Sequence, residues 1–241
     1  MATLKRMDGR KVDELRPLII KAGILEKAQG SALVKMGRTH AIAAVYGPRE
    51  LYPKFLQKPD KALLRCRYNM APFSTEDRVK PGHSRRSIEI SKVVGEALEA
   101  AVYLNEFPKS VIDVYVEIIQ ADAGTRTAAL NAAAVALADA GIPMKDLVAS
   151  VSAGKIGNEY VLDLAGKEED ETHCDLPVAY SPRDKKVTLL QMDGDLPKQD
   201  VLKVIELAIK GCEQIYEEQK KALKERWVGE AKARSLINGG V

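Results

Sequence analysis

The 241 residues are 46% hydrophobic and 29% charged, with 37 lysines and arginines against 34 acidic residues. This composition is ordinary for a soluble globular protein and provides enough apolar material for a sizeable core. A net charge of +3 is too small to require a nucleic acid partner, so the local distribution of charge is more informative than the sum.

The cysteines and the termini predict the compartment. Cys66, Cys174 and Cys212 are far apart and odd in number, which argues against a disulfide framework and favours a reducing cytoplasm. The polar N-terminal residues do not resemble a signal peptide, and no apolar stretch reaches membrane-spanning length. We therefore expect a cytoplasmic protein that has no membrane partner.

The first half of the chain predicts strands, then a helix, then another strand. Four runs have strand-like composition between turn signals: 17–27, 31–36, 40–46 and 62–70. Residues 86–103 carry apolar side chains at helical spacing, and 111–119 return to strict alternation.

The second half predicts a helix, then a set of strands, and then a long helix. A helix is expected at 126–140, because Gly141 and then Pro143 are typical of a helix end. Four further strands are expected at 147–156, 159–164, 176–181 and 186–192, and a long helix at 198–224. We predict one α+β domain over residues 1–225, built from two related halves, and a flexible tail over 226–241.

The segment between the strand at 111–119 and the next helix has the composition of an anion-binding loop. Gly124 permits close approach of the backbone, Thr125 offers a hydroxyl, and Arg126 a planar guanidinium that binds phosphate through two hydrogen bonds. The alternative is an ordinary helix start with a solvated arginine. Because short motifs match often by chance, the tripeptide alone favours that alternative.

An acidic cluster, residues 168–171, precedes Asp175. Carboxylates at Asp170 and Asp175 have the oxygen ligands that Mg²⁺ prefers, and one of them could act as a general acid. A solvated acidic loop explains the cluster equally well, but it explains Asp175 less well, because Asp175 leads directly into a predicted strand.

Basic residues occur in two groups. Arg65 and Arg67 would project from one face of a strand, whereas Arg85 and Arg86 begin a helix, where the dipole disfavours cations. The second placement indicates an anionic partner. Tyr68 offers a ring for base stacking, although a tyrosine at the edge of the core explains it as well.

Two other chemistries are excluded by pattern. His173 and Cys174 would point to opposite faces of a strand, so they cannot form a nucleophile and base pair. No phosphate-binding Gly-x-x-x-x-Gly-Lys-Ser/Thr motif occurs, which argues against ATP-driven work.

Taken in order, the segments resemble the phosphorolytic exoribonucleases of the RNase PH type over nearly the whole chain. The motifs that carry the resemblance are Arg6–Arg10 with Glu14–Pro17, Gly30–Gly37, Ala44–Pro48, Ser84–Arg86 with Glu89–Ser91, Gln120–Ala128 and Gln191–Gly194. Within the family, Arg65–Ser74 and Ala138–Met144 with Asp146–Leu147 are most similar to the catalytic ring subunits of archaeal exosomes.

The resemblance implies a fold of two β/α halves with mixed sheets packed on helices. It implies a hexameric ring, a trimer of heterodimers in which this subunit alternates with a non-catalytic paralogue around a channel for single-stranded RNA, together with RNA-binding cap proteins. It implies degradation from the 3′ end with inorganic phosphate as co-substrate and Mg²⁺ as cofactor, releasing nucleoside diphosphates, and the reverse tailing reaction.

The resemblance also implies a role for each candidate residue. Gly124, Thr125 and Arg126 become the phosphate site, Asp175 the catalytic acid, and Asp170 a second catalytic acid that shares the metal with Asp175. The implied RNA contacts are Arg65, Arg67, Tyr68, Arg85 and Arg86. The acidic loop is one residue shorter than is usual in the family, so the second acid is either Glu169 or Asp170.

This interpretation requires Arg126 and Asp175 to converge on one terminal linkage. Two alternatives remain at this stage. One is a homohexameric enzyme of the same chemistry that trims transfer-RNA ends, and the other is a non-catalytic RNA-binding ring subunit. The second is disfavoured because the arginine and the aspartate are both present.

Overall fold

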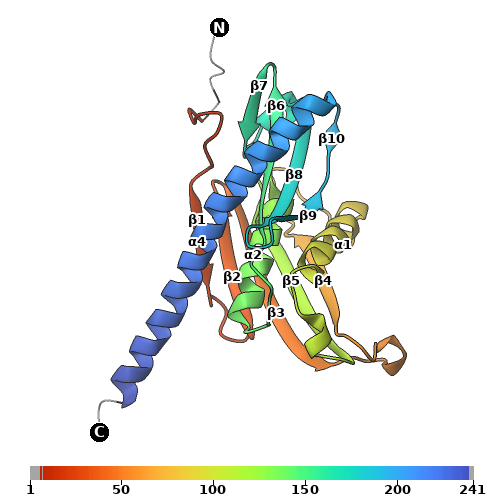
Figure 1. Ribbon diagram of the computed structural model, residues 1–241, viewed down its shortest axis with the longest axis vertical. Coiled ribbons are helices and arrows are strands. Elements are labelled where there is room, and N and C mark those ends of the chain that lie inside the picture. Colours follow the sequence, from red (N-terminus) through yellow and green to blue (C-terminus); the bar gives the residue numbers. More distant parts are fainter. Residues whose placement is uncertain (1–5, 7, 239–241) are drawn as a thin grey trace.

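The computed structural model describes residue 6 and residues 8–238, apart from the side chains of Asp170 and of residues 230–238. Within this range the chain folds into two sheets and a set of helices that pack against both (Figure 1). The expected α+β class with two β/α halves is confirmed.

The first sheet has five strands in the order β1-β2-β3-β5-β4. Its strands are β1 (Leu18–Ala22), β2 (Gly30–Met36), β3 (Thr39–Glu50), β4 (Leu63–Met70) and β5 (Ser110–Gln120). The pairs are antiparallel except for β4 and β5, which run parallel because helix α1 (Arg85–Glu99) carries the chain back between them.

The second sheet is antiparallel throughout, in the order β10-β8-β6-β7 with β9 paired to β8. Its strands are β6 (Ala149–Ile156), β7 (Glu159–Leu162), β8 (Cys174–Ser181), β9 (Lys186–Leu190) and β10 (Asp193–Gly194). The central pair, β6 and β8, is almost completely buried, which explains the nearly continuous apolar runs in their sequences.

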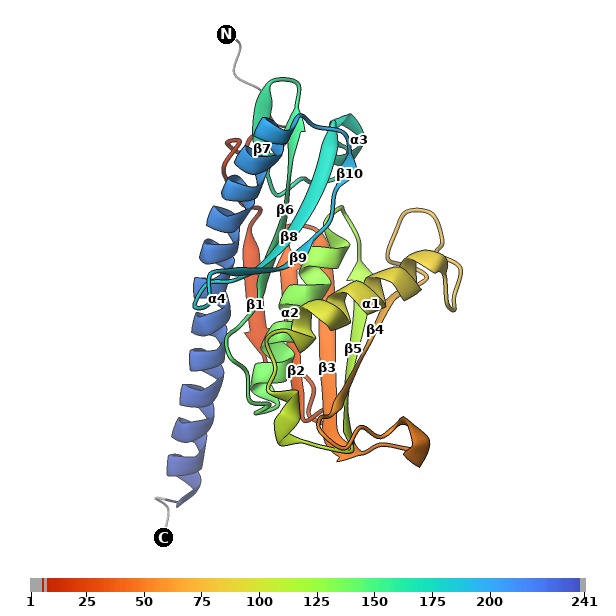
Figure 2. The same cartoon turned by 45° about the vertical axis from the view of Figure 1, so that its right-hand side comes forward.

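Helix α2 (Thr125–Asp139) lies in the centre of the molecule and contacts strands of both sheets. Figure 2 shows the helix in the middle of the molecule. It is buried on nearly all sides, and its alanines allow the backbones of neighbouring elements to approach closely. Gly30 of β2 is one such contact, because a Cβ atom there would lie 2.3 Å from the carbonyl oxygen of Ala136. The C-terminal part of this central helix is therefore packed closely against β2.

Helix α4 (Lys198–Asn238) runs along the outside of the molecule and contacts both sheets (Figure 1). The helix was expected to end at 224, and that prediction was wrong, since the structure continues it to Asn238. The proposed flexibility of 226–241 stays a prediction, and 239–241 lie outside the described residues.

Two other expectations about secondary structure need correction. The acidic residues 168–171 were expected as a loop but form the short helix α3 (Glu168–Glu171). The first long helix ends at Glu99 instead of 103, and the 3₁₀ turns η1 (Lys54–Leu56) and η2 (Leu104–Glu106) were not foreseen.

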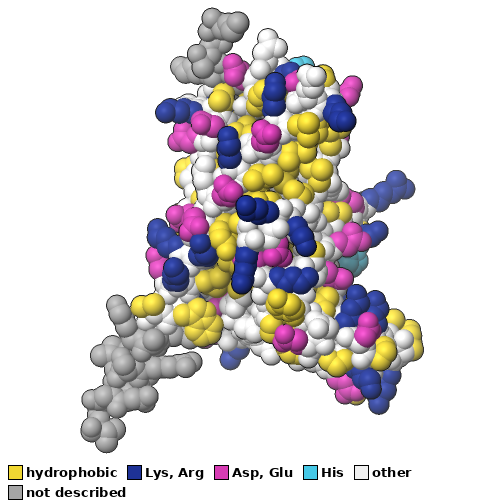
Figure 3. Space-filling model, viewed as in Figure 1, with side chains coloured by type: hydrophobic (Ala, Val, Ile, Leu, Met, Phe, Trp, Pro, Cys, Tyr) yellow, Lys and Arg dark blue, Asp and Glu magenta, His cyan; other side chains and the backbone are white. Residues whose placement is uncertain are grey.

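The surface agrees with the nearly balanced charge of the chain. In the view of Figure 3, lysine and arginine side chains are interspersed with acidic ones. No helix within the described range is long and apolar enough to cross a membrane.

Candidate active site

The β5–α2 loop (residues 122–124) has an unusual backbone. Ala123 and Gly124 have φ angles of 59° and 64°, which lie in the left-handed region. Gly124 is the N-cap residue, and none of the described side chains caps the helix. The N–H groups of the first turn of α2 are therefore available to bind an anion, as the composition of the loop predicted.

Arg126 follows in the first turn of α2 and is partly buried. Its Nη2 atom lies 3.1 Å from Glu89 Oε2 of α1, and Gln191 Nε2 donates to the other oxygen of Glu89 at 2.8 Å. The Nε atom of Arg126 is buried and has no hydrogen-bond partner among the described residues. An anion that accepts from this N–H would remove the unfavourable burial of an unpaired donor.

Asp175 lies near the start of β8, and its Oδ1 atom is also buried without a partner in the described structure. Burial raises the pKa of this carboxyl to about 6, and the negative charges of Glu169 and Asp193 act in the same direction. The Ser152 hydroxyl and Arg126 oppose the rise. At neutral pH a group with this pKa is protonated in about a tenth of molecules, which suits a general acid.

Arg126 and Asp175 line one cavity of about 270 Å³, named here the Arg126 cavity. Its wall is formed by α1, the start of α2, β6, β8 and the residues around β10. The expected convergence of the guanidinium and the carboxyl, which are distant in the sequence, is therefore observed. An anion bound to Arg126 would lie in the same space as a proton donor.

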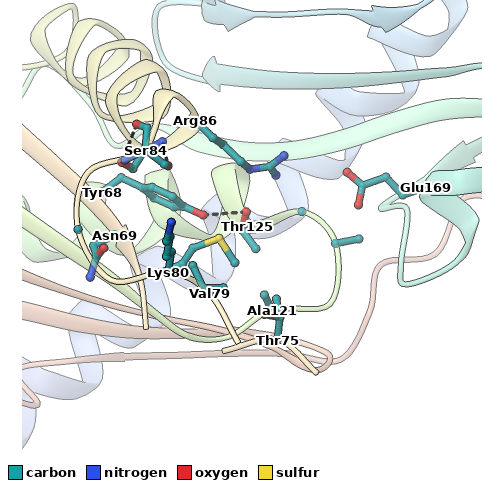
Figure 4. Close-up of a pocket in the computed structure, with 15 residues that line it drawn as sticks. Tyr68, Asn69, Thr75, Val79, Lys80, Ser84, Arg86, Ala121, Thr125 and Glu169 are labelled. Carbon is teal, nitrogen blue, oxygen red and sulfur yellow. Dashed lines mark hydrogen bonds between the residues drawn. The ribbon is translucent and has the colours of Figure 1, made fainter. Parts of the chain in front are cut away.

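A second cavity of about 420 Å³, named here the Tyr68 cavity, adjoins the first. The two share Arg86, Gly124, Thr125 and Glu169 in their linings. In Figure 4, Arg86 of α1 and Glu169 of α3 point into the space from opposite sides. Its volume and mixed lining suit one nucleotide, with Arg86 near the junction of the two cavities.

Tyr68 does not offer the stacking face that we expected. The residue is only 2% exposed, and its hydroxyl donates to Thr125 Oγ1 at 3.0 Å. Because the residue is almost completely buried, the structure corrects its role from base stacking to orienting the Thr125 hydroxyl (Figure 4). Thr125 can then donate its own proton to an anion at the helix start.

Three of the predicted RNA contacts, Arg65, Arg67 and Arg85, lie outside these two cavities. Arg65 and Arg67 project from the opposite face of β4 to Tyr68 and line a separate cavity of about 400 Å³ with His83. Arg65 Nε also lies 2.6 Å from Asp113 Oδ1, so one of the two cations is already paired. Arg85 is exposed at the first position of α1, outside the described lining of the Arg126 cavity and of the Tyr68 cavity.

The residues of the acidic helix α3 have different surroundings. Glu168 is buried and binds the Arg6 guanidinium, with Nη2 to Oε2 at 2.7 Å, so it is not a solvated acid. Glu169 lines both the Arg126 cavity and the Tyr68 cavity, and its negative charge raises the pKa of Asp175. The side chain of Asp170 lies outside the described residues, so its catalytic and metal-binding roles stay predictions. Glu169 is the second acid that the geometry supports.

The site is compatible with a magnesium ion, although the described residues contain no cluster of three or more metal-ligating side chains. Mg²⁺ is usually held by one or two carboxylates together with substrate phosphates. The unpartnered Oδ1 atom of Asp175 and the nearby Glu169 carboxylate provide such a donor set. The structure agrees with the rejection of a Cys–His pair, since Cys174 is buried and His173 is exposed.

Three further cavity-lining residues were not predicted as site residues: Glu89, Gln191 and Asp193. Glu89 lies one turn after Arg86 on α1, so its helical spacing from the arginines was an available signal. Gln191 and Asp193 lie in the Gln191–Gly194 motif that carries the family resemblance, but that motif alone assigned them no role in the site. Only the fold brings them opposite the start of α2.

Comparison with known proteins defines the class to which this fold and site belong. Residues 14–143 match domain 1 of the 3′ exoribonuclease family, and residues 146–211 match domain 2. The chain therefore belongs to the 3′ exoribonuclease family. The two matched domains meet at the site, because Arg126 comes from the first and Asp175 from the second.

Individual relatives are similar over most of their length. The chain is 57% identical over 224 residues to the exosome complex component Rrp41 of Thermococcus kodakarensis, covering 93% of this chain and 90% of the relative. It is 53% identical over 226 residues to Rrp41 of Archaeoglobus fulgidus, covering 92% and 88%.

Solved structures agree with the fold. A chain of the Archaeoglobus fulgidus exosome with RNA bound to the active site superposes with a TM-score of 0.77 at 27% identity, covering 89% of this chain and 92% of that one. Rice Rrp46 superposes with a TM-score of 0.81 at 24% identity, covering 90% and 100%.

The raised pKa of Asp175 predicts an effect on stability. The Asp175 carboxyl has a pKa of about 6 in the folded chain against 3.8 as its ordinary value, so it ionises more readily in the unfolded chain. The stability of the wild type therefore falls as the pH rises from about 4 to about 6. Asp175→Asn removes this penalty. We expect the variant to be more stable than the wild type at pH 8, by about 1 to 3 kcal/mol, and the difference to vanish near pH 4.

Urea unfolding of both proteins at the two pH values, in the presence of EDTA, measures this difference. An equal or lower stability of Asp175→Asn at pH 8 would show that the carboxylate is not destabilised in the folded chain.

Proposed function

We propose that this protein is the catalytic subunit of an exosome ring, which shortens single-stranded RNA from the 3′ end with inorganic phosphate. The single observation that carries the proposal is that Arg126 and Asp175 line one cavity, and that each carries a buried polar atom without a hydrogen-bond partner among the described residues. The similarity to Rrp41 proteins of archaeal exosomes supports the same conclusion.

In the proposed reaction, Thr125, Arg126 and the first turn of α2 bind inorganic phosphate. A phosphate oxygen attacks the phosphorus of the last phosphodiester, and the bond from that phosphorus to the 3′ oxygen of the preceding nucleotide breaks. Asp175 donates its proton to this departing oxygen, and the products are a nucleoside diphosphate and an RNA one nucleotide shorter. Binding both reactants in one cavity replaces a bimolecular encounter by a positioned one.

Glu89 and Gln191 have a supporting part in this scheme. Glu89 holds the Arg126 guanidinium through Nη2, which leaves the buried Nε atom without a partner among the described residues and so free to donate to phosphate. Gln191 in turn fixes the Glu89 carboxylate. The guanidinium is thereby oriented before phosphate binds, which reduces the reorganisation required during the reaction.

The Mg²⁺ ion belongs to the proposal as well. Asp175 together with Glu169 or Asp170 would hold it, and it would offset negative charge on the transferred phosphoryl group. Arg86 would bind the terminal RNA phosphates at the junction of the two cavities, with Arg65, Arg67 and Arg85 as further contacts along the strand. Phosphate contacts of this kind position RNA without reading its sequence.

The partners follow from the same proposal. We expect a hexameric ring in which the chain alternates with a non-catalytic paralogue, RNA-binding cap proteins above it, and a cytoplasmic location. A homohexamer that trims transfer-RNA ends would have the same site, and size-exclusion chromatography of the chain alone tests it. A stable active hexamer without the paralogue would favour the homo-oligomer.

The function is tested by incubating the chain, with and without its paralogue, with 5′-labelled single-stranded RNA at increasing phosphate concentration. We expect shortening from the 3′ end that requires phosphate, and elongation when nucleoside diphosphates are supplied instead. Shortening that is independent of phosphate would contradict the proposal.

A further inference from the structure

The backbone of the β5–α2 loop is strained at a residue that is not glycine. Ala123 has a φ angle of 59°, and the left-handed region is unfavourable for a residue with a Cβ atom. Such a conformation persists only where the surrounding structure fixes it. The contacts that fix this loop therefore identify the residues that determine its shape.

Thr39 provides the first of these contacts. It is fully buried at the start of β3, and its hydroxyl donates to the Ala123 carbonyl oxygen at 2.7 Å while accepting from the Asp122 N–H at 2.9 Å. One side chain thus binds the donor of one loop residue and the acceptor of the next. This pairing opposes relaxation of Ala123 to a right-handed conformation.

Arg16 provides the second contact and joins the loop to the other half of the protein. Its Nη1 atom donates to the Asp122 carbonyl oxygen at 2.6 Å, and its Nη2 and Nε atoms donate to the Asp163 carboxylate at 2.8 and 3.0 Å. Asp163 follows β7 of the second sheet and is 1% exposed. A Cβ atom on Gly124 would lie 2.8 Å from Arg16 Nη2, so the guanidinium lies directly against the loop.

We infer that Arg16 and Thr39 are positioning residues that hold the β5–α2 loop, and with it Thr125 and Arg126, in the conformation that accepts inorganic phosphate. This inference rests on the proposed function. Both residues lie outside the described lining of the Arg126 cavity, so they act on the ligand only through the loop. The hydrogen bonds of Arg16 to Asp163 also fix the loop relative to the second half of the protein, which carries Asp175.

The test compares Arg16→Lys and Thr39→Val with the wild type, each as the full chain assembled with its paralogue. We expect the KM for inorganic phosphate to rise about tenfold or more, since small displacements of binding groups are costly in rate. The KM for RNA should stay within about twofold, because Arg86 and the Tyr68 cavity are unchanged. Simple loss of folded protein would lower kcat and leave both KM values as they are.

Two matched controls separate positioning from general destabilisation. Arg6→Lys alters an equally buried arginine of the same N-terminal segment. This arginine binds Glu168 and the carbonyl oxygens of Leu162 and Asp163, but the described structure gives it no hydrogen bond to the loop. Thr188→Val removes a buried hydroxyl that has no hydrogen-bond partner among the described residues. Both controls should keep the KM for phosphate within about twofold of the wild type.

Phosphate-dependent melting of each full chain provides a readout that is independent of turnover. Phosphate should raise the melting temperature of the wild type and of both controls, and should raise that of Thr39→Val less. If Arg16→Lys does not fold, Thr39→Val decides the question alone. The inference is overturned, while the proposed function stands, if the KM for phosphate is unchanged in Thr39→Val. It is also overturned if the KM for phosphate rises as much in the two controls as in Thr39→Val. Wild-type RNA shortening that ignores phosphate overturns both.

Discussion

Replacing Asp175 by asparagine is expected to abolish RNA phosphorolysis while RNA binding is preserved. The variant keeps the size of the side chain but cannot donate the proton that the 3′ oxygen needs. We expect kcat to fall by about 10³-fold, which is within the range for loss of a general acid that also binds a metal ion. The dissociation constant for RNA should stay within about threefold, because the basic contacts are unchanged.

Single-turnover degradation of labelled RNA and fluorescence anisotropy measure these two quantities. Asp193→Asn is the matched control, because it makes the same chemical change at an exposed carboxylate in the lining of the same cavity. We expect that control to lose less than about tenfold in kcat. Comparable losses in the two variants would indicate that the cavity needs negative charge in general and not an acid at 175.

The second large effect is expected for Arg126→Lys. Lysine keeps the positive charge but has no planar fork, so it cannot bond Glu89 on one side and phosphate through Nε on the other. We expect kcat/KM for inorganic phosphate to fall by about 100-fold. The affinity for RNA should change little, since Arg86 holds the position at the junction of the cavities.

Steady-state rates at varied phosphate concentration test this prediction. Arg85→Lys serves as its control, because that arginine is exposed and outside the described lining of both cavities. Its kcat/KM for phosphate should stay within about threefold of the wild type. If Arg126→Lys retained the wild-type kcat/KM for phosphate, the guanidinium of Arg126 would not be part of the phosphate-binding site.

Much of the fold was predictable because its periodicities are local. Strict alternation over 111–119 appears as β5, whose apolar residues alternate into the core, and the alanine-rich run after Arg126 appears as the buried helix α2. The short helix α3 was missed because four acidic residues carry no apolar period. The end of α4 was missed because the apolar stripe stops where the helix leaves the core, although the backbone remains helical.

The site was less accessible to sequence reasoning than the fold. Local composition pointed to Gly124, Thr125 and Arg126, and the resemblance to a family pointed to Asp175. The pairing of Arg126 with Glu89 depends on how α1 packs beside α2, which no local pattern encodes. The burial of Tyr68 reverses its expected role for the same reason, because a strand pattern gives the face of a residue but not what covers that face.

The identity of the product tests the central claim most directly. The chain, assembled with its paralogue, is incubated with unlabelled single-stranded RNA and ³²P-labelled inorganic phosphate, and the nucleotides released are separated by chromatography. If phosphate bound at Arg126 attacks the linkage whose 3′ oxygen Asp175 protonates, the label will appear in nucleoside diphosphates. Release of unlabelled nucleoside monophosphates would instead identify water as the nucleophile and contradict the account.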